Sequence, residues 1–219
     1  MIRAIVFDLD GTLIDSRRDI AASANHALAA HGFPELSLEE IEGYVGDGAR
    51  ALLARSARLD ELDSRLDQLI ETFLDYYTAH PIDSTTLMPG AREALVEFAS
   101  LPLALCTNKP RRTTLAVLAG LGLSSTFRAV SAGGDHPEKK PHPRPILALG
   151  EILAVPAGAL LMVRDGEQDV LAGRAAGALT VGVRGGIQPV ERLLEARPDH
   201  LLETLYELPA LVEKLGVAS

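Results

Sequence analysis

Cysteine, positive charge and long apolar runs are all scarce in this sequence, and each scarcity excludes a class of protein. The 219 residues contain one cysteine, Cys106. An intramolecular disulfide is therefore excluded, and a reducing compartment, the cytoplasm, is expected. No apolar run approaches the roughly 18–20 residues of a transmembrane helix. The N-terminal residues are typical of a strand rather than of a charged and then apolar signal segment, so we expect no export.

Positive charge is outweighed by negative charge. The chain carries 21 basic and 30 acidic residues, for a formal net charge of −9. This balance argues against nucleic acid and anionic membranes as partners. An anionic substrate would need local cations, from a metal or from a few lysines and arginines, to offset the repulsion. We expect a small-molecule substrate and a monomer or homodimer.

Composition and length are those of a globular protein with one α/β domain and a smaller second one, since 47% of the residues are hydrophobic and 23% are charged. Strands alternate with helices over residues 90–219, which predicts a doubly wound parallel sheet, a Rossmann-like core. Residues 15–83 have helical periodicity and no convincing strand, which predicts an inserted all-helical cap domain. The core is then formed by residues 1–14 and 84–219.

Hydrophobic periodicity and turn residues predict the individual elements. Strands are expected at 2–7, 102–107, 128–131, 159–163, 179–183 and 200–202. Helices are expected at 17–31, 49–57, 60–79, 90–100, 146–153, 167–176 and 189–195, and in a last segment ending near 215. Ser37 and Glu40 have the spacing of a capping box, and Pro110 is expected at the first position of a helix.

Two aspartates follow the first strand directly. Asp8 and Asp10 stand two positions apart, so their side chains project to the same side if the extended geometry persists. At the carboxyl end of a parallel strand that side opens into the usual ligand crevice. Two carboxylates there favour a hard cation such as Mg²⁺, or a division between a nucleophile and a proton carrier. The alternative is a solvated turn.

Polar residues follow three further core strands or the loop after one of them. They are Thr107 and Asn108, then Lys139 and Lys140, then Asp165 and Asp169. Each pair alone has a structural interpretation, as a helix cap, a solvated charge pair or a helix start. Right-handed connections make the strands parallel, so their carboxyl ends share one edge of the sheet. This convergence predicts one site at that edge.

These motifs, in this order, resemble those of the haloacid dehalogenase superfamily of phosphatases with a helical cap. Within it the sequence looks most like the phosphoglycolate phosphatases. The matching segments are Phe7–Leu13, Thr107–Pro110, Gly133–Asp135 with Lys140–Pro143, and Asp165 and Asp169 followed by Ala175–Gly177. The resemblance implies a Mg²⁺-dependent phosphomonoester hydrolase of a small metabolite such as 2-phosphoglycolate.

The resemblance also assigns roles to single residues. Asp8 would be the nucleophile that forms an aspartyl-phosphate, and Asp10 the general acid for the leaving oxygen and then the base for water. Thr107 and the Asn108 backbone N–H would hold phosphoryl oxygens. Lys140 would offset the charge of Asp8 and the phosphate.

Mg²⁺ would be held by the Asp8 carboxylate, the Asp10 carbonyl and Asp165, with waters completing an octahedron. Asp169 would contact the metal-bound waters or Lys140. One Mg²⁺ and one lysine would bring three positive charges to the site. The net charge of the chain then need not exclude an anionic substrate.

The fourth motif departs from the family pattern, which usually reads Gly-Asp-Ser. Here it is Arg164, Asp165 and Gly166. Strand alternation turns the Arg164 side chain away from Asp165, so we expect it to reach the surface. The alternatives are that it crowds the strand end or contacts a phosphate or a carboxylate. Cys106 is expected to be a small buried apolar residue.

Three other activities compete with hydrolysis. A phosphomutase of the same superfamily is the nearest enzymatic alternative, and phosphate release distinguishes the two. A catalytically impaired relative that binds a phosphorylated ligand or a partner is the second, and Arg164 is what supports it. A dehalogenase would not need Asp10 and Asp165. Residues 45–50 of the cap are candidates for specificity, although Gly46 and Gly48 also suit a plain turn.

Overall fold

The core of the protein is a six-stranded parallel sheet. The computed structural model describes residues 1–217, so the last two residues of the predicted core, 218–219, lie outside the described residues. The strands stand in the order β5-β4-β1-β6-β7-β8. Their bounds are Ala4–Phe7 (β1), Leu103–Pro110 (β4), Ala129–Gly133 (β5), Leu160–Arg164 (β6), Leu179–Val183 (β7) and His200–Leu202 (β8).

Both faces of this sheet are buried, which explains why the strands are apolar without interruption. In β1, Ile5 and Phe7 belong to one buried cluster, and Ala4 and Val6 belong to another on the opposite face. Such burial on two sides is typical of parallel sheets. The covering helices are α5 (Ala91–Glu97), α6 (Arg111–Gly120), α7 (Arg144–Leu153), α8 (Glu167–Ala176), α9 (Val190–Glu195) and α10 (Leu208–Leu215).

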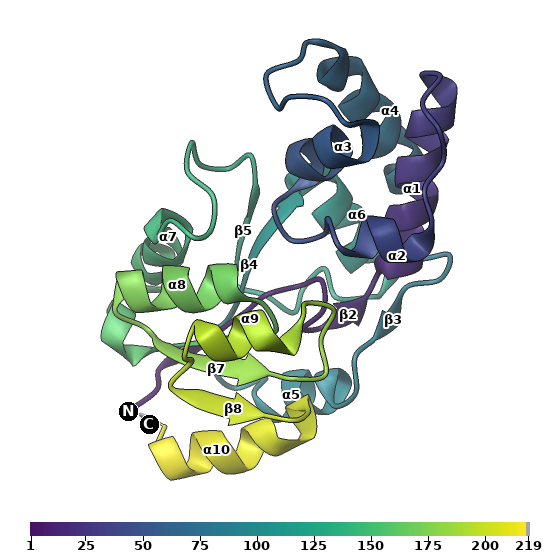
Figure 1. The fold of residues 1–219 in the computed structure, drawn as a ribbon. Coiled ribbons are helices and arrows are strands. Elements are labelled where there is room, and N and C mark those ends of the chain that lie inside the picture. Colours follow the sequence, from purple (N-terminus) through teal and green to yellow (C-terminus); the bar gives the residue numbers. More distant parts are fainter. Residues whose placement is uncertain (218–219) are drawn as a thin grey trace.

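Residues 17–79 form a separate group of helices, named here the helical insertion. Figure 1 shows it beyond one end of the sheet, coloured purple to blue. Its helices are α1 (Arg17–Ala30), α2 (Leu38–Glu42), α3 (Ala49–Ala57) and α4 (Arg65–Ala79). The insertion was predicted from helical periodicity, and the chain is helical there. Its division from the core as a domain stays a prediction.

The chain enters and leaves the helical insertion through a small antiparallel sheet. Strand β2 (Ile14–Asp15) pairs with β3 (Thr86–Leu87). Next to it, the buried carboxylate of Asp19 accepts hydrogen bonds from the backbone N–H groups of Ser84 and Thr85 and from the Thr85 hydroxyl. These bonds fix the start of α1 to the returning chain.

Most predicted elements are confirmed, and several boundaries are corrected. The capping box of Ser37 and Glu40 is present. Strand β4 runs to Pro110 rather than ending at Thr107, and Pro110 is the N-cap rather than the first residue of α6. Helix α4 begins at Arg65 instead of residue 60. Strands β2 and β3 were not predicted, because two residues are too short for a periodicity.

Within residues 1–217, no helix combines the length and the apolar character needed to cross a membrane.

Candidate active site

A pocket at the carboxyl ends of the parallel strands contains the predicted site residues. Asp8, Asp10, Thr107, Lys140 and Asp165 all line it. The predicted residues Asn108 and Asp169 line it as well, and so do several residues of the helical insertion, including Val45–Ala49, Leu52, Arg55, Phe73 and Tyr77. The sheet edge and the insertion thus enclose one site.

Asp8 is tied to a buried lysine. Lys140 Nζ donates to Asp8 Oδ1 at 2.7 Å. No hydrogen bond within residues 1–217 uses Asp8 Oδ2, so this oxygen is free to react. Burial raises the pKa of Asp8 to about 7, an effect that Lys140 opposes and the charges of Asp169 and Asp165 reinforce.

Lys140 joins Asp8 to Asp169. Its Nζ also donates to Asp169 Oδ1 and, at 2.8 Å, to the carbonyl of Cys106, so all three ammonium protons have acceptors. Burial alone would lower the pKa of Lys140, but the carboxylates of Asp169 and Asp8 outweigh it and raise the pKa. Lys140 is therefore a cation at neutral pH.

Asp10 is held through one of its two carboxylate oxygens. Ser16 Oγ donates to Asp10 Oδ1 at 2.5 Å, and Lys109 Nζ donates to the same atom at 2.9 Å. Asp10 Oδ2 has no hydrogen-bond partner in the part of the chain that is described. Lys109 is itself oriented by Tyr77 of α4, whose hydroxyl accepts a 2.6 Å bond. The helical insertion thereby helps to position Asp10.

Asp165 lies in a tight backbone cradle. A Cβ at Gly11 would lie 2.0 Å from Asp165 Oδ2, and one at Gly186 would lie 2.1 Å from Asp165 Cβ. The backbone N–H groups of Ile187 and Gln188 donate to Oδ2. Burial raises the pKa of Asp165, and these N–H groups oppose the rise. Glycine is required at position 11, where φ is +85°.

The donor atoms of this site suit a hard divalent cation. Four carboxylates, those of Asp8, Asp10, Asp165 and Asp169, meet three buried cations, those of Lys109, Lys140 and Arg164, so the carboxylates outnumber the cations by one. A cation would offset that excess where the local dielectric is low. Asp165 accepts three hydrogen bonds, including one from the Thr12 hydroxyl at 3.2 Å, and so keeps one lone pair.

No group of three or more His, Cys, Asp or Glu side chains in residues 1–217 is arranged to hold a metal. The predicted set consists of two carboxylates, from Asp8 and Asp165, and one backbone carbonyl, from Asp10. It stays a prediction.

Arg164 is fully buried, so the expectation that it reaches the surface was wrong. Its Nη2 donates to Asp169 Oδ2 at 3.2 Å, which confirms the alternative of a carboxylate contact. Alternation does turn the side chain away from the pocket, but helix α8 covers that face of the sheet and supplies the acidic partner.

Thr107 and Asn108 occupy the irregular end of β4. Thr107 Oγ1 accepts the backbone N–H of Lys109 at 3.1 Å, and its own O–H has no acceptor in residues 1–217. The Asn108 side chain is engaged by the fold, because Nδ2 donates to the carbonyls of Gly46 and Lys140 and Oδ1 accepts the Lys140 N–H. The Thr107 hydroxyl is thus available to a ligand, whereas the side-chain amide of Asn108 is not. The predicted role of the Asn108 backbone N–H is separate from these bonds and stays a prediction.

The loop of residues 43–48 connects the helical insertion to the core above the pocket. Gln188 Nε2 donates to the Val45 carbonyl at 2.6 Å, and Gln168 Nε2 donates to Asp47 Oδ1 at 2.5 Å. Arg50, one of the predicted specificity candidates, instead pairs with Asp67 within the insertion. The loop therefore covers the site, and Arg50 does not line it.

Sequence reasoning missed several residues that shape the site. Lys109 and Ser16 on Asp10, and Thr12 and Gln188 on Asp165, had been given no role. Lys109 lies within the motif that begins at Thr107, and Thr12 lies within the motif Phe7–Leu13, so motif membership was the available signal for these two. The other contacts depend on how loops far apart in the sequence meet.

Comparisons with known proteins agree with this geometry. A family model described as haloacid dehalogenase-like hydrolase matches residues 5–183. A phosphoglycolate phosphatase of Neisseria gonorrhoeae is 36% identical over 216 residues, covering 94% of this chain and 92% of its own. One of Vibrio parahaemolyticus is 36% identical over 219 residues, covering 96% of each chain.

The fold has a close counterpart among solved structures. The crystal structure of a predicted phosphoglycolate phosphatase from Haemophilus somnus superposes with a TM-score of 0.87 at 27% identity, covering 96% of this chain and 97% of the other. Sequence and structure therefore agree along nearly the whole chain. The chain belongs to the haloacid dehalogenase-like hydrolases and, within them, is similar to the phosphoglycolate phosphatases.

Proposed function

We propose that this protein is a Mg²⁺-dependent phosphomonoester hydrolase that acts through an aspartyl-phosphate on Asp8. The observation that carries the proposal is the arrangement of Asp8, which lines the pocket: Lys140 holds one carboxylate oxygen at 2.7 Å, and the other has no hydrogen-bond partner in residues 1–217. A carboxylate attacks phosphorus without first losing a proton to a base, provided that it is ionised.

In the first step, Asp8 Oδ2 forms a bond to phosphorus while the bond from phosphorus to the leaving oxygen breaks. The leaving oxygen takes a proton from Asp10. Both hydrogen bonds to Asp10 end on Oδ1, so Oδ2 is the atom that carries this proton. The Thr107 hydroxyl donates a hydrogen bond to a phosphoryl oxygen, and Lys140 offsets the negative charge around Asp8.

In the second step, water attacks phosphorus and the bond from phosphorus to Asp8 Oδ2 breaks. Asp10 Oδ2, deprotonated by the first step, accepts the proton of the attacking water. Phosphate is released, and both aspartates return to their starting protonation states. The two steps balance in atoms and charge with water as the only co-reactant.

The Asp8 carboxylate, the Asp10 carbonyl and Asp165 would hold Mg²⁺. When bound, it would supply positive charge next to Asp8 and the phosphoryl oxygens. Burial disfavours the charged forms of Asp8 and Asp165, and an adjacent divalent cation would offset that penalty.

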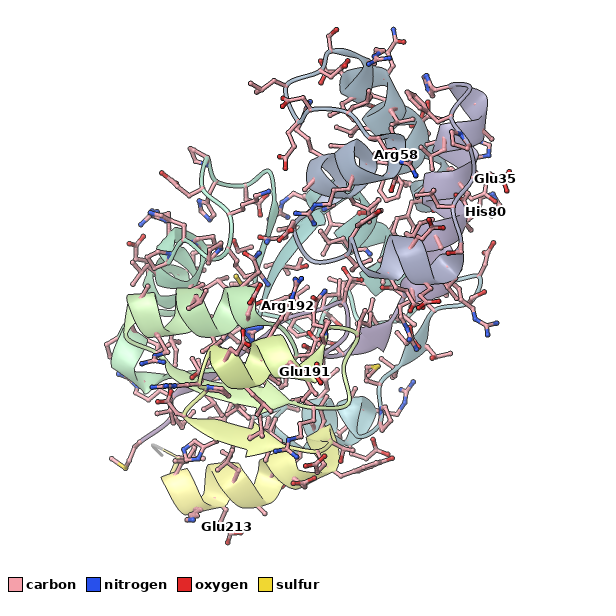
Figure 2. All side chains as sticks on the ribbon, viewed as in Figure 1. Glu35, Arg58, His80, Glu191, Arg192 and Glu213 are labelled. Atoms are coloured by element: carbon pink, nitrogen blue, oxygen red, sulfur yellow. The ribbon has the colours of Figure 1, made fainter. Side chains whose placement is uncertain are left out.

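A small anionic metabolite fits the rest of the pocket, and the names of the relatives make 2-phosphoglycolate the leading candidate. Two arginines line the pocket in addition to Lys140. Arg55 of α3 pairs with Asp47, and Arg192 of α9 has its Nη1 3.9 Å from Glu167. Arg192 is labelled in Figure 2. A substrate carboxylate would find a cationic partner in either.

The helical insertion would act as a cap that excludes water and selects the substrate. Its contacts with the core through residues 43–48 support this role. The cytoplasmic location and the choice between monomer and homodimer stay predictions from composition.

The phosphomutase alternative shares the same first step and differs in the fate of the phosphoryl group. The binding-only alternative depended on Arg164 obstructing the site. Arg164 does not line the pocket, and it pairs with Asp169 instead. That placement removes the main argument for an impaired site.

The test is phosphate release from a panel of small phosphomonoesters that includes 2-phosphoglycolate, with Mg²⁺ and with a chelator. Hydrolysis predicts Mg²⁺-dependent release that disappears in Asp8→Asn. Thr107→Val, which keeps the shape of the side chain but removes the hydroxyl, should lower release without abolishing it. Transfer of phosphate to a second sugar phosphate without release would identify a mutase and contradict the proposal.

A further inference from the structure

The one buried arginine of the site has no explanation in the mechanism above. Arg164 ends strand β6 and is 0% exposed. Its only protein partner in residues 1–217 is Asp169, and both Nε and Nη1 are buried without any partner. Burying a guanidinium is unfavourable unless its N–H groups are paired. Fold stability therefore does not account for this residue.

We infer that Arg164 is a positioning residue, which acts through Asp169 to hold Lys140 against the nucleophile Asp8. This inference rests on the proposed role of Asp8 and goes beyond it, because it assigns a task to the position at which this chain departs from the family pattern.

The geometry consists of three consecutive ion pairs. Arg164 Nη2 donates to Asp169 Oδ2 at 3.2 Å, Asp169 Oδ1 accepts from Lys140, and Lys140 donates to Asp8 Oδ1 at 2.7 Å. The two cations thus bind different oxygens of the Asp169 carboxylate. All four side chains are at least nine-tenths buried by residue.

The Asp169 carboxylate needs two partners to be fixed in orientation. The terminal torsion of an aspartate has broad, roughly two-fold wells, so a single contact leaves the carboxylate plane free to rotate. With Arg164 on Oδ2, only Oδ1 remains for Lys140. Without Arg164, Lys140 Nζ can reach either oxygen and move away from Asp8.

The position of Lys140 matters because it decides which oxygen of Asp8 is free. A lysine displaced by about 1 Å would bind both oxygens of Asp8 or neither, and misplacement of that size costs on the order of 100-fold in rate. In the proposed function, substrate binding depends on Thr107 and the pocket arginines, and Arg164 makes no hydrogen bond or ion pair with them in residues 1–217. The effect should therefore fall on kcat rather than on KM.

The kinetic test uses Arg164→Met, with Arg144→Met as the control. Arg144 is an exposed arginine on the neighbouring helix α7 that pairs with Glu151. We expect Arg164→Met to lower kcat by about 10- to 100-fold with KM changed less than about threefold. Arg164→Gln, which is polar but uncharged, should do the same and serves if the methionine variant does not fold. Arg144→Met should match the native protein.

A double-mutant cycle separates this role from a general structural one. If Arg164 acts through Asp169, then adding Arg164→Met to Asp169→Asn should not lower kcat further. Losses that multiply would overturn the inference. A native kcat in both Arg164 variants would overturn it as well.

A spectroscopic measurement decides the matter even without turnover. The chain has four lysines, Lys109, Lys139, Lys140 and Lys214, so ¹⁵N-lysine labelling gives few side-chain signals. The Lys140 signal, identified by its loss in Lys140→Arg, should shift in Arg164→Met, while that of buried Lys109 stays in place. If the native protein hydrolyses no phosphomonoester, the proposed function fails, and this result does not test the positioning role. If the Lys140 signal does not shift in Arg164→Met, the positioning role is contradicted whether or not the protein is active.

Discussion

Replacing Lys140 by methionine should destabilise the protein strongly at pH 8. The ammonium group is 3% exposed by side chain and donates to two carboxylates and one carbonyl. Methionine preserves the stem of the side chain but leaves Asp8 and Asp169 buried without this partner. Removing one member of a buried ion pair costs about 3–5 kcal/mol. For a chain of this length, Tm should fall by roughly 6–20 °C.

The loss should depend on pH. Burial already raises the pKa of Asp8 to about 7, with Lys140 opposing the rise. Without the lysine that pKa rises further, so at pH 5 Asp8 is neutral and the missing cation matters less. The free energy of unfolding, measured by urea denaturation, should therefore differ more between native and variant at pH 8 than at pH 5.

Lys139→Met is the matched control. Lys139 is the adjacent residue, is exposed, and donates only to the Asp47 carbonyl among residues 1–217. It should change the free energy of unfolding by less than about 0.5 kcal/mol. A loss below about 1 kcal/mol for Lys140→Met at pH 8, or a loss equal to that of Lys139→Met, would refute this account of the site.

Three further predictions concern the aspartates and their cradle. The pKa of Asp8 is raised to about 7 in the metal-free folded protein, so between about pH 4 and 7 the folded state holds a proton that the unfolded state has released. The stability that this proton contributes is fully present below about pH 4 and is lost as the pH rises through about 7. Asp8→Asn removes the effect, so its free energy of unfolding relative to that of the native protein should rise by about 2.5 kcal/mol between pH 5 and pH 8. Gly11→Ala should abolish Mg²⁺-dependent phosphate release and lower Tm, since its Cβ would lie 2.0 Å from Asp165 Oδ2 at a φ of +85°; an active, stable Gly11→Ala would contradict the cradle. Asp10→Asn should lower kcat/KM, which reports the first step, by about 100- to 10,000-fold on alkyl phosphates; an equal loss of kcat/KM on p-nitrophenyl phosphate, whose leaving group needs no proton, would argue against proton donation.

The parts of the site that sequence could predict share one physical cause. Asp8 and Asp165 each follow an apolar strand, Thr107 lies near the carboxyl end of another, and parallel strands must end at one edge of a sheet. The helical insertion was predictable because its periodicity changes from that of strands to that of helices. Local pattern was sufficient in both cases.

Other parts depend on contacts that no local pattern encodes. Lys109 meets Asp10 across 99 positions of sequence, and Tyr77 joins them from the helical insertion. The backbone N–H groups of Ile187 and Gln188 reach Asp165 from a loop after another strand. Such bonds exist only once the loops have been placed by the packing of the core.

Arg164 shows where strand alternation is insufficient. The rule gave the direction of its side chain correctly but not its surroundings, because the face it points to is covered by α8. A charged residue that was expected to reach the surface is fully buried, with Asp169 of the covering helix as its partner. Alternation predicts a face of the sheet, and only the tertiary structure shows what packs against it.

The central claim is that Asp8 carries the phosphoryl group, and mass spectrometry tests it most directly. Asp10→Asn protein, which should lack the base for the second step, would be mixed with p-nitrophenyl phosphate and Mg²⁺, quenched in acid and digested. The account predicts one phosphoryl group on the peptide that contains Asp8, absent from the Asp8→Asn control. Release of p-nitrophenol with no phosphoryl group on that peptide, or with one on another residue, would contradict it.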